Sequence, residues 1–269
     1  MANREVETYT LHAGTAPLLV SLPHDGTAVP AEIAARFLPA ARRVPDTDWH
    51  VSRLYEFARE LGASIIVPKH SRYVVDLNRP PDDVSLYPGQ NTTGLCPIVQ
   101  FSGEPVYLDG AEPTPEEVNA RVDLYWRPYH AALARELARI RSQHGRAVLW
   151  DGHSIRSVVP FLFDGRLPDF NLGTASGKSC SAQLQQRLGA ILAAQDQYTS
   201  VVNGRFKGGH ITRHYGRPEQ DMHAVQLEMC WACYMAERPP YELDPTRMKR
   251  LLPVLHALAH TMLRWSPHA

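Results

Sequence analysis

The sequence lacks the features that membrane, nucleic-acid-binding and secreted proteins require. Its 28 basic and 28 acidic residues give a formal net charge of zero, so there is no electrostatic case for binding nucleic acid or an anionic membrane surface. No apolar run is long enough to span a bilayer, and the N-terminus, Met-Ala-Asn-Arg-Glu-Val-Glu, has no apolar signal-peptide core. The four cysteines form no regular framework, as in a reduced intracellular protein. We therefore expect a soluble, cytoplasmic protein.

Short motifs that identify many hydrolases are also missing. There is no His-Glu-x-x-His metal motif, and Ser154 lacks the Gly-x-Ser-x-Gly elbow of a serine nucleophile. Cys230-Trp-Ala-Cys233 has no second cysteine pair and lies in an apolar stretch, so we expect buried free cysteines there. We find no internal repeat and no low-complexity tract. A catalytic site would have to be assembled from residues far apart in the chain.

What the sequence does contain is an alternation of apolar strands and amphipathic helices. Residues 147–150 are apolar without polar alternation and run into Asp151, which is typical of a strand buried on both faces. Further strands are predicted at residues 17–22, 64–67, 73–77, 200–202 and 224–228. Helices are predicted at residues 30–38, 49–61, 114–144, 179–194 and 244–265, with another from about residue 229. This order predicts a three-layer α/β fold, mostly parallel with helices on both faces, as one domain over residues 1–269.

Several predicted strands end in residues that can do chemistry, namely His24, Asn78, Arg79, His153 and Glu228. Right-handed crossovers bring the C-terminal ends of parallel strands to one edge of the sheet, so we expect these side chains to converge. Asp48, at the start of a predicted helix, could join them. Two imidazoles and one carboxylate match the three-ligand pattern of a catalytic zinc site, which keeps a fourth position open.

Such a site suggests a role for each group. A metal would lower the pKa of a bound water to roughly 7. Glu228, as a second carboxylate not bound to metal, would take that water's proton and pass it to the leaving group. Arg79 would hold a substrate carboxylate through paired hydrogen bonds. Each residue also has a structural alternative: a turn residue for His24 and His153, a helix cap for Asp48, and a buried ion pair for Glu228.

Six segments carry a further signal because they occur together. They are Leu22-Pro-His24-Asp25-Gly26, Pro45-Asp46-Thr-Asp48-Trp-His50, Ser71-Arg72-Tyr-Val-Val-Asp-Leu-Asn78-Arg79-Pro80, Trp150-Asp151-Gly-His153-Ser-Ile-Arg156, Asn203-Gly-Arg-Phe-Lys-Gly-Gly-His210-Ile-Thr-Arg213-His-Tyr-Gly216 and Val225-Gln-Leu-Glu228. Taken together they resemble the N-formylglutamate amidohydrolase family, over about residues 17–234. The combination is much more specific than any one of the motifs.

The resemblance implies a zinc-exopeptidase-like fold and the hydrolysis of N-formyl-L-glutamate to formate and L-glutamate in histidine degradation. By comparison with zinc carboxypeptidases, it also implies roles for five residues. These are two metal-binding imidazoles, a general base and a pair that grips the substrate's α-carboxylate, in the order His24, His153, Glu228, Asn78 and Arg79.

The third metal ligand departs from the carboxypeptidase pattern. Those enzymes carry an acidic ligand three residues after the first histidine, and this chain has Thr27 at that position. The carboxylate must therefore come from elsewhere in the chain. Asp48 is our choice, and Asp25 and Asp46 remain alternatives.

The substrate's second carboxylate calls for another cation besides Arg79. Arg213, in the glycine-rich segment 203–221, is our first candidate, followed by Arg205. His210 and His214 have the spacing of a helical metal pair, but the glycines on either side argue against a helix there. We therefore predict that His210 contacts substrate and does not bind metal.

Three alternative functions make different demands on the sequence. The same machinery could act on another N-acyl amino acid or small amide, which only kinetics can decide. A non-catalytic binding module would lack Glu228 or the metal site. A non-haem iron oxygenase would use His-x-Asp or His-x-Glu, and no histidine here has an acidic residue two positions on. We expect one divalent metal, zinc first, although iron, cobalt and manganese suit the same ligands. The expected partner is a small dicarboxylate substrate; the oligomeric state stays open.

Overall fold

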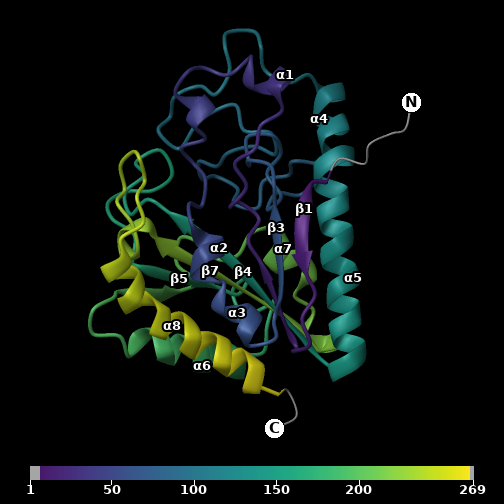
Figure 1. The fold of residues 1–269 in the computed structure, drawn as a ribbon, viewed down its shortest axis with the longest axis vertical. Coiled ribbons are helices and arrows are strands. Elements are labelled where there is room, and N and C mark those ends of the chain that lie inside the picture. Colours follow the sequence, from purple (N-terminus) through teal and green to yellow (C-terminus); the bar gives the residue numbers. More distant parts are fainter. Residues whose placement is uncertain (1–6, 267–269) are drawn as a thin grey trace.

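The computed structural model describes residues 7–266, and these residues contain one mixed sheet of seven strands (Figure 1). In chain order the strands are β1 (Tyr9–His12), β2 (Leu18–Ser21), β3 (Ser64–Pro68), β4 (Ala147–Ile155), β5 (Phe170–Gly173), β6 (Ser200–Val202) and β7 (Met222–Cys230). Their order across the sheet is β1-β3-β2-β4-β7-β5-β6. The central strands β3, β2, β4 and β7 are parallel, whereas β1 and β5 pair antiparallel with β3 and β7. The predicted α/β class with a mostly parallel sheet is confirmed.

Helices cover both faces of this sheet. Figure 1 shows α6 and α8 on one side and the long column of α4 and α5 on the other. The helices are α1 (Ala31–Ala34), α2 (Val51–Leu54), α3 (Phe57–Glu60), α4 (Pro115–Arg121), α5 (Arg127–His144), α6 (Ala182–Ala193), α7 (His210–Tyr215) and α8 (Pro245–Arg264). Shorter turns are η1 (Ala41–Arg43), η2 (Val122–Trp126), η3 (Pro218–Gln220) and η4 (Trp231–Cys233). Between residues 7 and 266, no helix has the length and apolarity needed to cross a membrane.

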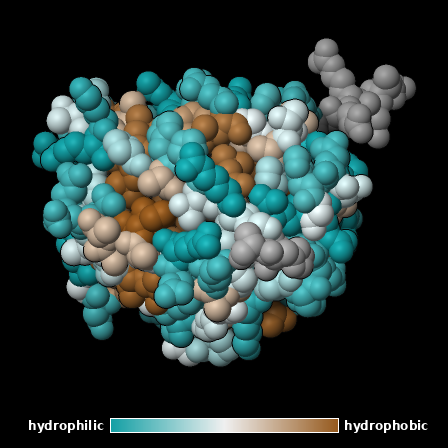
Figure 2. All heavy atoms as spheres, turned by 90° about the horizontal axis from the view of Figure 1, so that it is seen from below, coloured by the Kyte–Doolittle hydropathy of each residue, from teal (hydrophilic) through white to brown (hydrophobic). Residues whose placement is uncertain are grey.

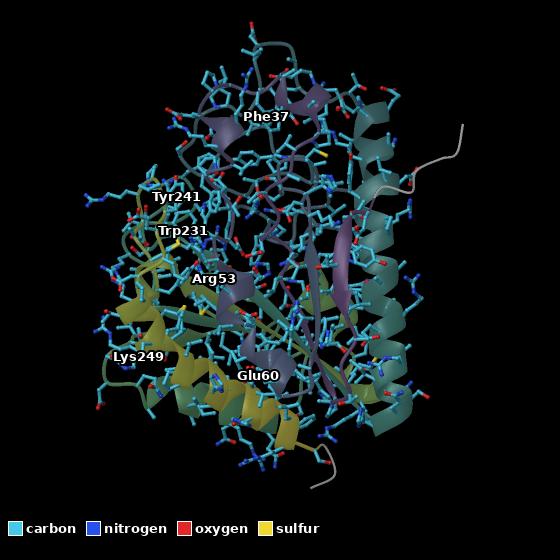
Figure 3. All side chains as sticks on the ribbon, viewed as in Figure 1. Phe37, Arg53, Glu60, Trp231, Tyr241 and Lys249 are labelled. Atoms are coloured by element: carbon cyan, nitrogen blue, oxygen red, sulfur yellow. The ribbon has the colours of Figure 1, made fainter. Side chains whose placement is uncertain are left out.

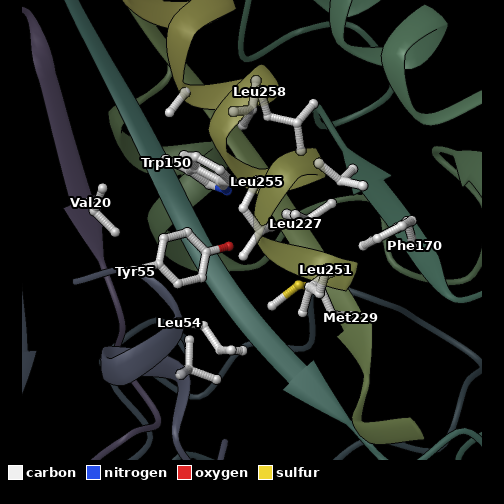
Figure 4. Close-up of a cluster of buried hydrophobic side chains, with 14 of the residues drawn as sticks. Val20, Leu54, Tyr55, Trp150, Phe170, Leu227, Met229, Leu251, Leu255 and Leu258 are labelled. Atoms are coloured by element: carbon white, nitrogen blue, oxygen red, sulfur yellow. The ribbon is translucent and has the colours of Figure 1, made fainter. Parts of the chain in front are cut away.

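Alternate side chains of the central strands pack into two separate apolar cores, one on each face of the sheet. Trp150 of β4 faces the core beneath α6 and α8, where Figure 4 shows it near Leu255 and Leu258. Its neighbour Leu149 faces the core beneath α4 and α5. Phe37 belongs to this second core, in the upper part of the molecule in Figure 3. Because both faces of these strands are buried, they read in the sequence as continuous apolar runs.

The outer surface is mainly polar. On the face seen in Figure 2, hydrophobic residues form separate patches between hydrophilic ones. All four cysteines are buried and free, which confirms the prediction made for Cys230 and Cys233.

The helix predicted at residues 114–144 is present but contains an unusual turn. The Thr114 side chain caps it by accepting a hydrogen bond from the Glu117 N–H at 3.3 Å, as its capping-box spacing suggests. Between α4 and α5, the segment η2 (Val122–Trp126) is π-helical, and it ends just before Pro128 in the first turn of α5. Gly145 ends α5 with φ 72°, a conformation that glycine adopts without strain.

Three local predictions are wrong. Residues 73–77 form buried turns and no strand, because Asp76 folds the backbone back: its side chain accepts the Asn78 N–H and its carbonyl accepts the Arg79 N–H. The helix predicted at residues 49–61 is two short helices, α2 and α3. The helix predicted from residue 229 is replaced by the end of β7, which stays paired with β4 up to Cys230, and the single turn η4.

Besides the edge strand β1, two elements were not expected. The segment 203–221 contains α7, because Gly209 and Gly216 lie at its two ends and do not interrupt it. The segment after β4 contains β5, a four-residue strand too short to show a pattern of its own. Both elements lie close to the carboxyl ends of the central strands.

Candidate active site

A cavity of about 670 Å³, counted with its open mouth, lies at the carboxyl ends of the central strands. His24 follows β2, while His153 and Glu228 occupy paired positions in β4 and β7. Paired positions of neighbouring strands project to the same face of a sheet. All three side chains line the cavity. The predicted convergence is therefore present, although His153 and Glu228 lie within their strands and not beyond them.

Three buried residues, His24, Asp48 and His153, offer ligand atoms that all lie within 4.8 Å of one another. Oδ2 of Asp48 lies 3.8 Å from Nδ1 of His24 and 3.2 Å from Nδ1 of His153. The backbone of Ser154 donates to the same oxygen at 3.0 Å. This cluster could bind a metal ion.

Of the three candidate aspartates, Asp48 is the one that faces both imidazoles. Asp46 instead accepts hydrogen bonds from the Tyr73 hydroxyl at 2.6 Å and the Phe101 N–H at 2.8 Å. Asp25 accepts from the Ser52 N–H at 3.0 Å. Asp48 is not a helix cap either, because α2 begins after His50 and has no side-chain cap.

A second pair of carboxylates lies behind the two imidazoles. Nε2 of His24 lies 2.7 Å from Oδ1 of Asp76, and Nε2 of His153 lies 3.1 Å from Oδ1 of Asp151. Metal-binding histidines commonly donate their other ring N–H to a carboxylate, which fixes the tautomer and the ring orientation. The two Nδ1 atoms are thereby directed toward Asp48. The donor set therefore fits a divalent metal such as zinc in both its ligand types and its supporting groups.

Charges within this cluster are strongly coupled. Burial lowers the pKa of His24, and the nearby Arg72 lowers it further. Burial opposes the charged form of His153 too, but Asp151 and Asp48 raise its pKa well above the usual value. Burial alone would raise the pKa of Asp76, yet Arg72 and His24 hold it well below its usual range. Asp76 is thus ionised near neutral pH beneath the cluster.

Glu228 is a buried carboxylate on the wall of the cavity. Burial raises its pKa to about 8, the charge of His153 lowers it and that of Asp48 raises it. Its side chain accepts a long hydrogen bond from the Gln226 amide, at 3.5 Å. The structural alternative, a salt bridge to an arginine, is absent among the described residues. Burying a carboxylate without a cationic partner destabilises the fold, so a carboxylate in this position on a cavity wall indicates a catalytic or binding role.

Three arginines line the cavity, and each is held differently. Arg72 donates to Asp76 at 2.5 Å, and its Nη1 lies 3.5 Å from Nδ1 of His24. Among residues 7–266, Arg205 donates only to backbone carbonyls, those of Leu162 and Asn91. The Arg79 guanidinium has no hydrogen bond or ion pair with any residue of the described part of the chain. In the described part of the chain, neither Arg79 nor Arg205 forms an ion pair with a carboxylate, although the charges of Asp76 and Asp83 act on Arg79.

The other three residues predicted to bind substrate are not free to do so in the cavity as Arg79 is. Asn78 lines the cavity, but its side chain accepts from the Ile211 N–H at 2.8 Å and its amide nitrogen lies 2.9 Å from Nε2 of His153. His210 and Arg213, both on α7, are not among the residues that line the cavity. Arg213 is exposed and lies over the Tyr87 ring at 5.0 Å. The arginine that reaches the cavity from this segment is Arg205.

Two long loops meet at the cavity mouth. The Tyr87 hydroxyl donates to the Gly208 carbonyl at 2.9 Å, and the Arg205 guanidinium lies 5.6 Å from the centre of the Tyr87 ring. The loop that follows Asp82 and the segment before α7 therefore form one wall. Sequence analysis missed Arg72 and Asp76 as site residues, although both stand in one of the motifs singled out above. Their spacing of four residues was the available signal.

An α/β fold with two imidazoles and a carboxylate clustered beside a buried glutamate is typical of metal-dependent hydrolases. The sequence matches the family model for N-formylglutamate amidohydrolase over residues 16–235. This chain belongs to the N-formylglutamate amidohydrolase family.

Individual relatives agree. The chain is 51% identical to the N-formylglutamate deformylase of Pseudomonas aeruginosa, over 96% of this chain and 97% of that protein. It is 49% identical to the N-formylglutamate deformylase of Pseudomonas putida, over 95% and 96%. Among solved structures, N-formylglutamate amidohydrolase from Ralstonia eutropha JMP134 superposes with a TM-score of 0.79 at 26% identity, covering 96% of this chain and 97% of that one.

Proposed function

We propose that this protein hydrolyses N-formyl-L-glutamate to formate and L-glutamate, a step of histidine degradation, as a single catalytic domain. Two relatives that share about half of its residues carry the name N-formylglutamate deformylase. The observation that carries the proposal is the cavity itself. It brings a candidate metal cluster, a buried glutamate and unneutralised arginines together, as a small dicarboxylate amide requires.

We assign one divalent metal, zinc, to His24, Asp48 and His153. The support is the ligand chemistry: two imidazoles whose Nε2 atoms face carboxylates, with both Nδ1 atoms directed toward a third carboxylate. When bound there, zinc polarises the formyl carbonyl and lowers the pKa of a water. The chain's own residues then have to move one proton and hold the substrate.

Glu228 is the proposed general base. Its carboxylate accepts a proton from the attacking water and delivers it to the glutamate nitrogen as the C–N bond breaks. A new C–O bond gives formate, and the protonated nitrogen leaves as the amine of L-glutamate. Burial raises the pKa of Glu228 to about 8, which favours proton transfer near neutral pH.

We propose two roles for the three arginines of the cavity: one stabilises the charge that develops in the reaction, and two hold the substrate in position. Arg72 is the proposed donor to the carbonyl oxygen as it gains negative charge, because its Nη1 already lies beside Nδ1 of His24. Arg79 is the proposed partner of one substrate carboxylate and Arg205 of the other, since both line the cavity and neither forms an ion pair with an acid of the described residues. Asn78 we propose as a support for His153, given its contacts.

The substrate assignment is tested by kinetics on metal-free and zinc-restored protein. Chelation should abolish hydrolysis of N-formyl-L-glutamate, and one equivalent of zinc should restore it. We expect a higher kcat/KM for N-formylglutamate than for N-acetylglutamate or N-formylaspartate. Comparable values for all three would indicate a general N-acyl amino acid hydrolase instead. No hydrolysis after zinc is restored would refute the proposal.

The role of Glu228 is tested by Glu228→Gln, which keeps the size of the side chain. We expect kcat to fall about 10²- to 10⁴-fold, because general-base catalysis contributes about that much. Zinc content should stay at one equivalent. A matched control is Glu136→Gln, which alters another buried glutamate, bonded to Ser64 and Arg139 away from the cavity. Wild-type kcat in Glu228→Gln would contradict the mechanism.

A further inference from the structure

A second group of imidazoles lies outside the candidate active site, on α7 beside the sheet (Figure 1). His210 and His214 are one helical turn apart, with ring centroids 5.0 Å apart and ring planes inclined by 20°. His214 is exposed and His210 is partly buried. Two histidines one turn apart on a helix are the arrangement by which helical motifs hold zinc. In the sequence, the glycines on either side of these histidines argue against such a helix, but the structure contains it.

The separation of the two rings has the value that a shared metal requires. Ring nitrogens bound at about 2.1 Å to one tetrahedral zinc ion place the ring centroids roughly 5 Å apart. The observed separation is 5.0 Å. Because the ring planes are inclined by only 20°, the rings would have to rotate for both to direct a nitrogen at one ion.

The ring nitrogens are also available. Nε2 of His210 is buried and has no hydrogen-bond partner within residues 7–266. Burial lowers the pKa of His210 to about 4, helped by the charge of His214. Burial lowers the pKa of His214 as well, followed by the charge of Arg217. Both rings are thus neutral near pH 7, the form that binds metal. Asp82 is near enough for its charge to raise the pKa of His210, so an anionic group faces the same region.

We propose that His210 and His214 form a second binding site for a divalent transition metal, of the class of Zn²⁺, Ni²⁺ or Cu²⁺, for which imidazole is a suitable ligand. Neither residue lines the active-site cavity. The site is weaker than the His24, Asp48 and His153 cluster, because it has two close protein ligands where the cluster has three. It is independent of the function proposed above.

The chain contains a natural control for this proposal. His256 and His260 have the same spacing on α8, but their ring centroids lie 6.4 Å apart with an interplanar angle of 41°. The His256 ring is stacked on Phe57, with centroids 3.9 Å apart. That stacking holds His256 away from His260. The sequence spacing alone would predict a metal-binding histidine pair on both helices. The ring separations support only the pair on α7.

The test is a calorimetric titration with zinc chloride of protein already loaded with one equivalent of zinc. We expect a second, weaker binding event in the wild type and in His260→Ala, and its loss in His214→Ala and His214→Gln. Imidazole NMR signals of His210 and His214 should shift during the second event, while those of His256 and His260 stay in place.

Three results would overturn the second site. They are no second event in the wild type, its survival in both His214 variants, or its loss in His260→Ala. Hydrolysis of N-formyl-L-glutamate at one equivalent of zinc reports separately on the proposed function. It should be unchanged in all of these variants, because neither His214 nor His260 belongs to the catalytic or substrate-binding groups.

Discussion

Replacing Asp76 with asparagine keeps the shape of the side chain but removes a charge that three parts of the site share. Oδ1 of Asp76 lies 2.7 Å from Nε2 of His24 and accepts the Asn78 N–H at 2.8 Å. Oδ2 accepts from Arg72 at 2.5 Å. The asparagine retains one oxygen acceptor for these donors, while the buried Arg72 loses its counter-charge.

Two losses follow, and they can be measured separately. Breaking a buried ion pair by removing one partner costs about 3–5 kcal/mol. Arg72 retains its contact over the Phe101 ring, at 4.7 Å, so we expect about 3 kcal/mol off the unfolding free energy of the metal-free protein. Loss of the carboxylate behind a metal-binding histidine typically weakens metal affinity about 10- to 100-fold, and we expect that loss here.

Urea unfolding in the presence of a chelator measures the first loss, and competition with a coloured chelator for zinc measures the second. Asp123→Asn is the matched control, since Asp123 pairs with Arg127 at the same i,i+4 spacing but on the surface, and should cost under about 0.5 kcal/mol. Because the pKa of Asp76 is held below its usual range, its contribution is present above about pH 4 and is lost at lower pH. Wild-type stability and zinc affinity in Asp76→Asn would refute this account of the site.

Three further outcomes are expected. Arg205→Gln removes an unneutralised charge from the cavity, so the KM for N-formyl-L-glutamate should rise about 10- to 100-fold with a smaller change in kcat; an unchanged KM would exclude Arg205 from substrate binding. Burial lowers the pKa of His130 to about 3, so its neutral ring stabilises the fold above pH 6.5 and that contribution is lost as the pH falls toward 3, by up to about 1.4 kcal/mol per unit. Urea unfolding between pH 7 and 4 should show a shallower dependence in His130→Gln, and equal slopes would contradict this. Gly209→Ala puts a Cβ 2.4 Å from Nδ2 of Asn78 and should cost about 1–3 kcal/mol and lower kcat, as unfolding and kinetics can check; full stability would show that Asn78 moves freely.

The part of the site that belongs to the central strands could be predicted from sequence. His24, His153 and Glu228 each lie in or just after a strand buried on both faces, and such strands are recognisable as apolar runs. Their parallel direction then brings these residues to one edge. The sequence favours Asp48, but only the structure separates it from Asp25 and Asp46, because all three lie in short irregular segments.

The remaining site residues could not be predicted, because a short apolar run in the sequence looks the same whether it is buried in a turn or in a strand. Val74 and Val75 are buried as a strand's residues would be, yet hydrogen bonds to Asp76 fold this segment into turns. Those turns carry Arg72 and Asp76 into the cavity wall. Arg205 and Arg213 share one glycine-rich segment, and only α7 decides that Arg213 faces outward.

The π-helical turn η2 has a consequence for how this chain can change in length. A π-helix forms i→i+5 bonds, so one such turn inside an α-helix holds an extra residue. Trp126, its last residue, donates to the Arg79 carbonyl at 2.9 Å and stacks on His130 with centroids 3.6 Å apart. Deleting one residue of η2 before Trp126 would turn α4 by about 100° relative to Trp126 and α5, so either the contacts of α4 or those of Trp126 would be lost. Variants of this chain can therefore exchange residue types along η2, but an insertion or deletion there would have to be compensated at the backbone of Arg79, the proposed partner of a substrate carboxylate.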